Sequence, residues 1–178
     1  MANPPLTGVL LVGGASERFG SPKALARFRG ETLADRAWRL LGEVCAERIA
    51  VGKSADGLAL PFPVLDDGTE VRAPLAGLVA GLRAASHELA VVVPVDLPLL
   101  TGDALLALAA GCRDAAVPQT GPLPGAYRRT ALPALEQALA AGRLKLRDTV
   151  ARLDAALVRL PAEALENVND RDDLQRLE

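Results

Sequence analysis

The chain has 178 residues, half of them hydrophobic and about a quarter charged, which is typical of a soluble globular protein with one substantial core. A net charge of −2 excludes the strong positive field that attracts nucleic acid or anionic membranes, and an aromatic content of 3% argues against single-stranded nucleic acid as a ligand. We find neither an export signal nor an apolar run long enough to span a bilayer, so we expect a cytoplasmic protein with no nucleic-acid or membrane partner. Cys45 and Cys112 lie in apolar, helix-like stretches and are expected to be small buried hydrophobes.

The first half of the chain alternates strand and helix patterns. In order, these predict a strand at 8–12, a helix capped by Thr32, strands at 48–51 and 64–65, a helix beginning at Pro74 and a strand at 89–95. The buried face of the helix after Pro74 should consist of four apolar residues, Leu75, Leu78, Val79 and Leu82. Three consecutive valines indicate that the 89–95 strand is covered on both faces, although Pro94 should interrupt its hydrogen bonding.

The second half continues this alternation. In order, we expect a helix capped by Thr101, strands at 115–117 and 126–128, helices at 130–141 and 146–153, a strand at 157–160 and a last helix capped by Asp170. The alternation predicts a mostly parallel sheet with helices on both faces, in one domain spanning residues 1–178. Ligands of such folds bind beyond the carboxyl ends of the strands. That rule selects residues 13–23, Asp66, Asp67, Asp96 and residues 167–169 as candidate site residues.

A glycine-rich loop, LVGGASERFGSPK at 11–23, follows the first predicted strand. The N–H groups of Gly13 and Gly14 could bind phosphate oxygens, Arg18 offers a planar fork for phosphate, and Lys23 offers a compact positive charge. The glycine spacing matches neither a P-loop nor the dinucleotide-binding fingerprint. Composition alone favours an ordinary glycine turn with a solvated arginine and lysine, so the functional interpretation depends on the order of the residues.

Asp96 follows the valine-rich strand, in the sequence VVVPVDLPL at 91–99. Burying an unpaired carboxylate is costly, so this residue is not expected to serve the core. Mg²⁺ prefers oxygen ligands and often binds through one or two carboxylates together with substrate phosphates. We therefore favour a magnesium ligand at Asp96 over the alternative, a turn aspartate before Pro98.

Taken together, these segments resemble the molybdenum cofactor guanylyltransferases, and the resemblance extends over nearly the whole chain. The glycine-rich loop and the PVDLP sequence at 94–98 occur across related nucleotidyltransferases. The PLAG sequence at 74–77 and the NVN sequence at 167–169 narrow the resemblance towards molybdopterin as acceptor. The resemblance implies a three-layer α/β/α, Rossmann-like nucleotidyltransferase fold.

The resemblance also assigns roles to individual residues. It places Leu11, Val12 and Gly13 beside the nucleotide and Lys23 on its phosphates. It makes Asp67 a nucleotide-binding aspartate, with Asp66 as the alternative if the alignment shifts by one position. Asp96 corresponds to the magnesium ligand, and Asn169 is expected to assist with the metal or the substrate, unless it is only a turn residue.

Two positions depart from the family pattern. The family often has asparagine where this chain has Gly52, so that one polar nucleotide contact is either absent or replaced by Lys53. Pro124 and Gly125 stand where larger residues are usual, which alters the expected shape of the pterin side.

The activity implied by the resemblance is the transfer of GMP from GTP to molybdopterin, with Mg²⁺ as cofactor and release of pyrophosphate. The terminal phosphate of molybdopterin is already ionised, so no general base is required. Lys23, Arg18 and the loop N–H groups would stabilise the negative charge on the leaving phosphates, and Asp96 would hold the Mg²⁺. The possible protein partners are molybdenum cofactor insertion machinery or apo-molybdoenzymes. Two alternatives stay open: cytidylyl or another nucleotidyl transfer to molybdopterin or a small phosphorylated metabolite, and a non-catalytic nucleotide-binding relative.

Overall fold

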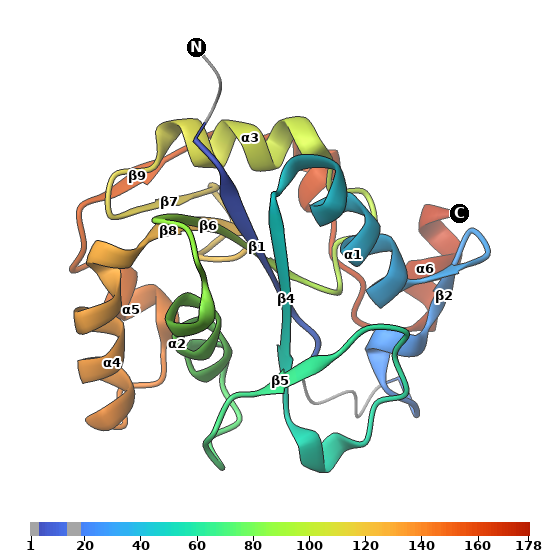
Figure 1. Ribbon diagram of the computed structural model, residues 1–178. Coiled ribbons are helices and arrows are strands. Elements are labelled where there is room, and N and C mark those ends of the chain that lie inside the picture. Colours follow the sequence, from blue (N-terminus) through green and yellow to red (C-terminus); the bar gives the residue numbers. More distant parts are fainter. Residues whose placement is uncertain (1–3, 14–18) are drawn as a thin grey trace.

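The computed structural model describes residues 4–13 and 19–178 and contains a central, mostly parallel sheet with helices on both faces (Figure 1). In the described residues this sheet has seven strands in the order β5-β4-β1-β6-β8-β7-β9. The strands are β1 (Leu6–Leu11), β4 (Glu47–Gly52), β5 (Val64–Asp66), β6 (Leu89–Pro94), β7 (Ala115–Val117), β8 (Gly125–Arg128) and β9 (Ala155–Leu157). Only β8 runs antiparallel to its neighbours, β6 and β7. The predicted three-layer α/β/α fold is confirmed.

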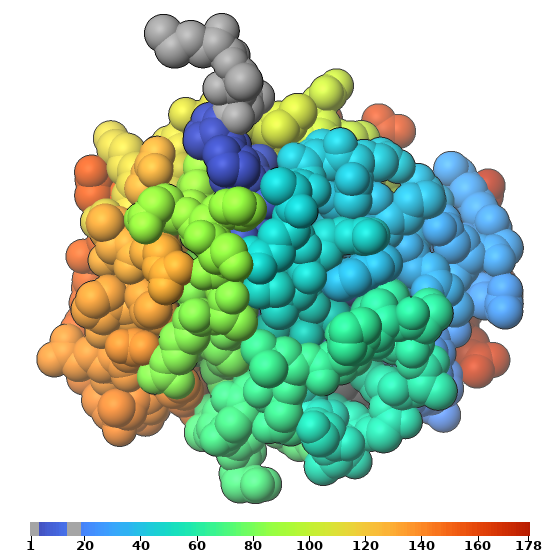
Figure 2. Space-filling model, in the orientation of Figure 1, coloured from blue at the N-terminus to red at the C-terminus, as the bar shows by residue number. Residues whose placement is uncertain are grey.

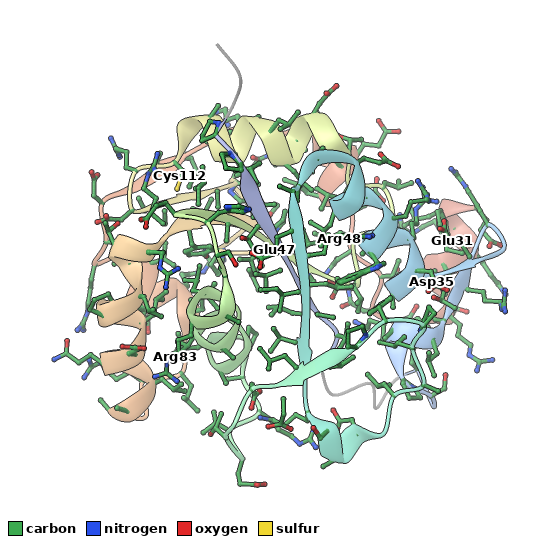
Figure 3. The ribbon with its side chains drawn as sticks, viewed as in Figure 1. Glu31, Asp35, Glu47, Arg48, Arg83 and Cys112 are labelled. Carbon is green, nitrogen blue, oxygen red and sulfur yellow. The ribbon has the colours of Figure 1, made fainter. Side chains whose placement is uncertain are left out.

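The helices divide between the two faces of the sheet. They are α1 (Leu33–Val44), α2 (Pro74–Ala84), α3 (Gly102–Gly111), α4 (Leu132–Ala140), α5 (Leu146–Val150) and α6 (Arg171–Leu177). One hydrophobic cluster lies under α1, α3 and α6, and a second lies under α2, α4 and α5. Figure 2 shows helices of both faces, with α2 and α4 side by side at the left and α1 at the right. Arg83 of α2, labelled in Figure 3, binds Glu136 of α4 at 2.6 Å.

Three predicted helix caps are present. The hydroxyl of Thr32 accepts a hydrogen bond from the N–H of Asp35 at 3.0 Å, at the start of α1. Thr101 accepts in the same way at the start of α3, and the carboxylate of Asp170 accepts at the start of α6. These bonds satisfy N–H groups that have no partner within the helix.

Glycines in α2 lie directly against side chains of β1. The four predicted core residues of α2 are all buried, and so are the alanines and glycines between them. A β-carbon on Gly81 would lie 2.5 Å from Val9 Cγ1, and one on Gly77 would lie 2.9 Å from Leu11 Cδ2. The two glycines therefore let the helix axis approach β1 more closely than any other residue would.

A polar network around buried Thr7 joins the amino-terminal ends of β1 and β4. Thr7 is fully buried and donates to Glu47 Oε2 at 2.6 Å, and the N–H and hydroxyl of Ser86 also donate to this carboxylate. Although partial burial would raise the pKa of Glu47, these hydrogen bonds hold it below its ordinary value. Figure 3 shows Glu47 at the middle of the molecule, beside Arg48 of the same strand.

The structure corrects several predicted elements. The last strand is at Ala155–Leu157 rather than 157–160, because its parallel pairing with β7 fixes which residues extend. Residues Arg129–Ala131 form a 3-10 turn before α4, and α5 ends at Val150 instead of 153. A short hairpin, β2 (Arg27–Phe28) and β3 (Glu31–Thr32), was not predicted.

Two further predictions concern Pro94 and the membrane. Pro94 is the last residue of β6, so the ladder ends where the missing N–H was expected to interrupt it.

Within the described ranges, no helix is both long and apolar enough to cross a lipid bilayer.

Candidate functional site

The candidate site is a cavity of about 370 Å³ at the carboxyl ends of four adjacent parallel strands, β5, β4, β1 and β6. The ends of β4 and β5 can be followed in the lower half of Figure 1. The volume falls within the range of pockets that hold small-molecule ligands and cofactors. The lining residues that the structure describes are Leu11, Val12, Gly13, Lys23, Val51, Gly52, Lys53, Asp67, Val71, Arg72, Ala73, Pro74, Gly77, Pro94, Val95, Asp96 and Leu123.

The end of β1 forms the floor of this cavity. Leu11, Val12 and Gly13 all line it, and the N–H of Val12 donates to the carbonyl of Val51 at 3.0 Å. This bond holds the ends of β1 and β4 together as the chain leaves the sheet. Two predicted residues of the following loop, Gly14 and Arg18, lie outside the described residues.

Lys23 and Asp96 form an ion pair in the wall of the cavity. Lys23 Nζ lies 3.4 Å from Asp96 Oδ2, and their side chains are 18% and 25% exposed. The backbone carbonyl of Asp96 accepts a hydrogen bond from the N–H of Val168 at 2.8 Å, which fixes the chain just beyond β6. A cation and a carboxylate are therefore both held at the point where β6 ends, in a position that a ligand can reach.

The two aspartates at the end of β5 have different surroundings. Asp67 lines the cavity and is 6% exposed, and its carboxylate binds Lys53 Nζ at 2.7 and 2.8 Å. Asp66 is exposed and accepts hydrogen bonds from the N–H groups of Ser54 and Gly68, which lower the pKa of its carboxyl. Of the pair that the sequence left open, Asp67 is the one that reaches the cavity, and Asp66 stabilises the turn.

The first turn of α2 supplies the opposite wall. Ala73, Pro74 and Gly77 line the cavity, and Ala73 provides no side-chain cap for the helix. The amino end of a helix carries a partial positive charge, so this turn favours an anionic or hydrogen-bond-accepting group. Beside it, Arg72 binds Asp56 at 2.8 Å while also lining the cavity.

Asn169 is not brought into the cavity. It is exposed, and its N–H donates to Asp173 Oδ2 at 2.8 Å. Its segment is nevertheless attached to the site through the bond between Val168 and Asp96. In the described part of the chain, no group of three or more histidine, cysteine, aspartate or glutamate residues could hold a metal ion.

The Pro124-Gly125 departure has a packing explanation. The hydroxyl of buried Tyr127 donates to the carbonyl of Pro122 at 2.6 Å, which closes the turn between them. A β-carbon on Gly125 would lie 2.6 Å from that carbonyl and 2.7 Å from the tyrosine ring, so a larger residue does not fit this turn. The same turn presents Leu123 to the cavity.

Lys53 and Arg72 also line the cavity. The sequence suggested Lys53 only as a possible replacement contact, with no partner, and did not suggest Arg72. The departure at Gly52 pointed towards Lys53, but the partner of Lys53 is 14 residues away and could not be read from a local pattern. Arg72 lay in no recognisable motif. Each of these basic side chains is paired with a carboxylate, Lys53 with Asp67 and Arg72 with Asp56.

A cavity at the carboxyl ends of parallel strands is where doubly wound α/β domains bind their ligands. The family model of the MobA-like NTP transferase domain matches residues 8–157, and the chain belongs to this family. A protein of Deinococcus radiodurans named probable molybdenum cofactor guanylyltransferase is 39% identical over 97% of this chain and 94% of that protein. A Pseudomonas putida protein named molybdenum cofactor guanylyltransferase is 33% identical, with 85% of each chain covered.

Solved structures agree with this assignment. Molybdopterin-guanine dinucleotide biosynthesis protein A of Archaeoglobus fulgidus superposes with a TM-score of 0.81 at 25% identity, covering 97% of this chain and 96% of that one. A 2-C-methyl-D-erythritol 4-phosphate cytidylyltransferase of Thermus thermophilus superposes with a TM-score of 0.71 at 22% identity, covering 96% of each chain. The latter likeness concerns the fold alone.

Proposed function

We propose that this enzyme, acting as one domain over residues 1–178, transfers GMP from GTP to molybdopterin and releases pyrophosphate. The observation that carries the proposal is the placement of Lys23 and Asp96 in one cavity, at the strand ends where the family's loop and its PVDLP sequence meet. The names of the full-length relatives supply the nucleotide and the acceptor. The cytoplasmic location remains a prediction from the sequence.

For this reaction the protein must position the two substrates and neutralise the negative charge on the reacting phosphates. The terminal phosphate of molybdopterin attacks the α-phosphorus of GTP in line, and the bond to the pyrophosphate leaving group breaks. Lys23 lies where it can stabilise the negative charge that develops on the leaving phosphates, and we assign Arg18 and the N–H groups of Gly13 and Gly14 to the same task. The nucleophile is an ionised phosphate, so no side chain need act as a base.

The residues present fit a magnesium ion. Asp96 offers carboxylate oxygens that are partly exposed within the cavity, and Mg²⁺ commonly binds through one or two carboxylates with phosphate oxygens as its other ligands. Asp96 would hold the ion, which would supply charge neutralisation at the reacting phosphates. Asn169 is a weaker candidate for this set, because its side chain lies outside the cavity lining.

The nucleoside part of GTP is assigned to the other end of the cavity. Leu11, Val12 and Gly13 form the floor there, and Asp67 supplies an acceptor for N–H or O–H donors of the nucleoside. The pterin substrate is assigned to the side of Leu123. Molybdenum cofactor insertion machinery and apo-molybdoenzymes are the proposed recipients of the product.

The test is calorimetric titration of GTP, CTP and ATP in the presence of Mg²⁺, with the wild-type protein and with Asp96→Asn. The proposal predicts clear preference for GTP, with weaker binding to the variant because it lacks the carboxylate charge. Preference for CTP would keep the reaction class and change the product. Absence of Mg²⁺-dependent binding of any nucleotide would contradict the proposal.

A further inference from the structure

Lys53 and Asp67 form a nearly buried ion pair in the cavity wall. Their side chains are only 11% and 6% exposed. Lys53 Nζ donates to both oxygens of Asp67, at 2.7 and 2.8 Å, and to the carbonyl of Thr69 at 2.6 Å. An ammonium group has three N–H donors, so these contacts use the full hydrogen-bonding capacity of Lys53.

The acceptor capacity of Asp67 is also nearly filled. A carboxylate has about four lone-pair sites, two on each oxygen. Oδ1 accepts from Lys53 and from the N–H of Thr69 at 3.1 Å, whereas Oδ2 accepts from Lys53 alone among the residues that the structure describes. One acceptor site therefore remains, and it belongs to Oδ2.

The backbone explains why this polar group extends from position 53. A β-carbon on Gly52 would lie 2.9 Å from Val12 Cγ2 and 3.3 Å from Val64 Cγ1, so the end of β4 is too crowded for a side chain. The next residue, Lys53, has the length to reach across to β5. The polar group at this end of β4 therefore meets Asp67 rather than pointing freely into the cavity.

We propose that Lys53 is a positioning residue: it holds Asp67 as a fixed carboxylate that offers the nucleoside part of the substrate one oxygen acceptor. Lys53 then controls nucleotide affinity without touching the nucleotide. This inference rests on the proposed function, because it assigns Asp67 to the nucleoside end of a nucleotide site.

The competing interpretation is direct contact between Lys53 and the triphosphate. For that contact the ammonium would have to give up at least one of its three acceptors, the two oxygens of Asp67 and the carbonyl of Thr69. Turning it fully towards the phosphates would leave a carboxylate that is only 6% exposed without its charge partner. Removing one partner of a buried pair is strongly unfavourable, whereas replacing both is often tolerated. Another cation of the cavity, Lys23, lies beside Asp96 and is better suited to the phosphates.

A double-mutant cycle separates these interpretations. Binding of GMP and of GTP, each with Mg²⁺, is measured by calorimetry for the wild type, Lys53→Met, Asp67→Asn and the double variant. Lys145→Met, at an exposed position outside the cavity lining, is the matched control. Thermal unfolding of each variant is recorded, and the double variant leaves no unpaired charge if Lys53→Met alone folds poorly.

We expect Lys53→Met to weaken GMP and GTP by the same factor, tenfold or more, and Lys145→Met to leave both unchanged. In the Asp67→Asn background the lysine substitution should change affinity less than threefold, because its target is gone. The double variant should also unfold at a higher temperature than Lys53→Met alone.

Two results would overturn the inference while the proposed function stands. One is a loss that is larger for GTP than for GMP and persists in the Asp67→Asn background, which indicates direct phosphate contact. The other is wild-type affinity in Lys53→Met. Failure of the wild-type protein itself to bind guanine nucleotides would contradict the proposed function, and the inference with it.

Discussion

Replacing Gly81 with alanine should destabilise the protein through a single contact. The new β-carbon would lie 2.5 Å from Val9 Cγ1 and 3.1 Å from Val9 Cγ2, distances that packed carbon atoms do not adopt. Val9 is fully buried and β-branched, so its side chain has little freedom to move away. Either α2 must move away from β1, or the strand must shift.

The size of the effect follows from two opposing contributions. Overpacking a well-packed core costs about 1–3 kcal/mol, and the rigid neighbour places this site near the upper end. The better helix propensity of alanine stabilises the folded protein by about 1 kcal/mol and so offsets part of this cost. The net loss should be about 2 kcal/mol, or roughly 4–8 °C in Tm for a chain of this size.

The assay is thermal and urea unfolding of Gly81→Ala beside Gly42→Ala. Gly42 is also in a helix, α1, but a β-carbon there would meet only the guanidinium of Arg48, the end of a flexible, exposed side chain. The control should change stability by less than about 1 kcal/mol. If Gly81→Ala unfolds at or above the wild-type temperature, the close approach of α2 to β1 is refuted.

Three further outcomes follow from the site and its surroundings. Asp96→Asn should lower turnover by orders of magnitude while its Tm stays within a few degrees of the wild type, and near-normal turnover would remove Asp96 from the reaction. The folded-state pKa of Glu47 lies below its ordinary 4.5, so its stabilising contribution is present above about pH 4.5 and is lost as the pH falls through the folded value. The stability difference between wild type and Glu47→Gln, from urea unfolding at several pH values, should therefore shrink below pH 4.5; a difference that does not change with pH would contradict this. Burial raises the pKa of Cys45 to about 12 and that of Cys112 to about 11, so thiol labelling at pH 8 should be slow in the native protein and fast after unfolding; fast native labelling would contradict it.

Local patterns predicted the starts of three helices well. The caps at Thr32, Thr101 and Asp170 each depend on a hydrogen bond to a backbone group three residues away, so the sequence contains both partners in one short window. Pro94 was also predictable, because a residue without an N–H cannot continue a ladder.

Elements that depend on distant pairing were not predictable in the same way. The position of β9 is set by its register with β7, about 40 residues earlier, rather than by its own hydrophobicity. Asp66 and Asp67 are adjacent and chemically identical, so only the three-dimensional path of the chain decides which one reaches the cavity. For the same reason, the sequence did not show that Lys53 binds Asp67.

The site residues that lie in recognisable local motifs were predictable from the sequence. Strand ends and the family's motifs were enough to select Leu11, Val12, Gly13, Lys23 and Asp96, which the structure brings to one cavity. The PLAG sequence marked the first turn of α2, but nothing local indicated that this turn and Arg72 would form a wall of the cavity. It is assembled by the packing of α2 against the sheet, which the small residues of that helix permit.

The most direct test of the central claim follows the label of GTP during the reaction. The protein is incubated with molybdopterin, Mg²⁺ and GTP labelled at the α-phosphate, and in a parallel reaction with GTP labelled at the γ-phosphate. The account predicts that the α-label enters a molybdopterin guanine dinucleotide while the γ-label leaves in pyrophosphate, in equal amounts. Label that stays in GTP, or a dinucleotide formed only when CTP is supplied, would contradict guanylyl transfer as the activity of this protein.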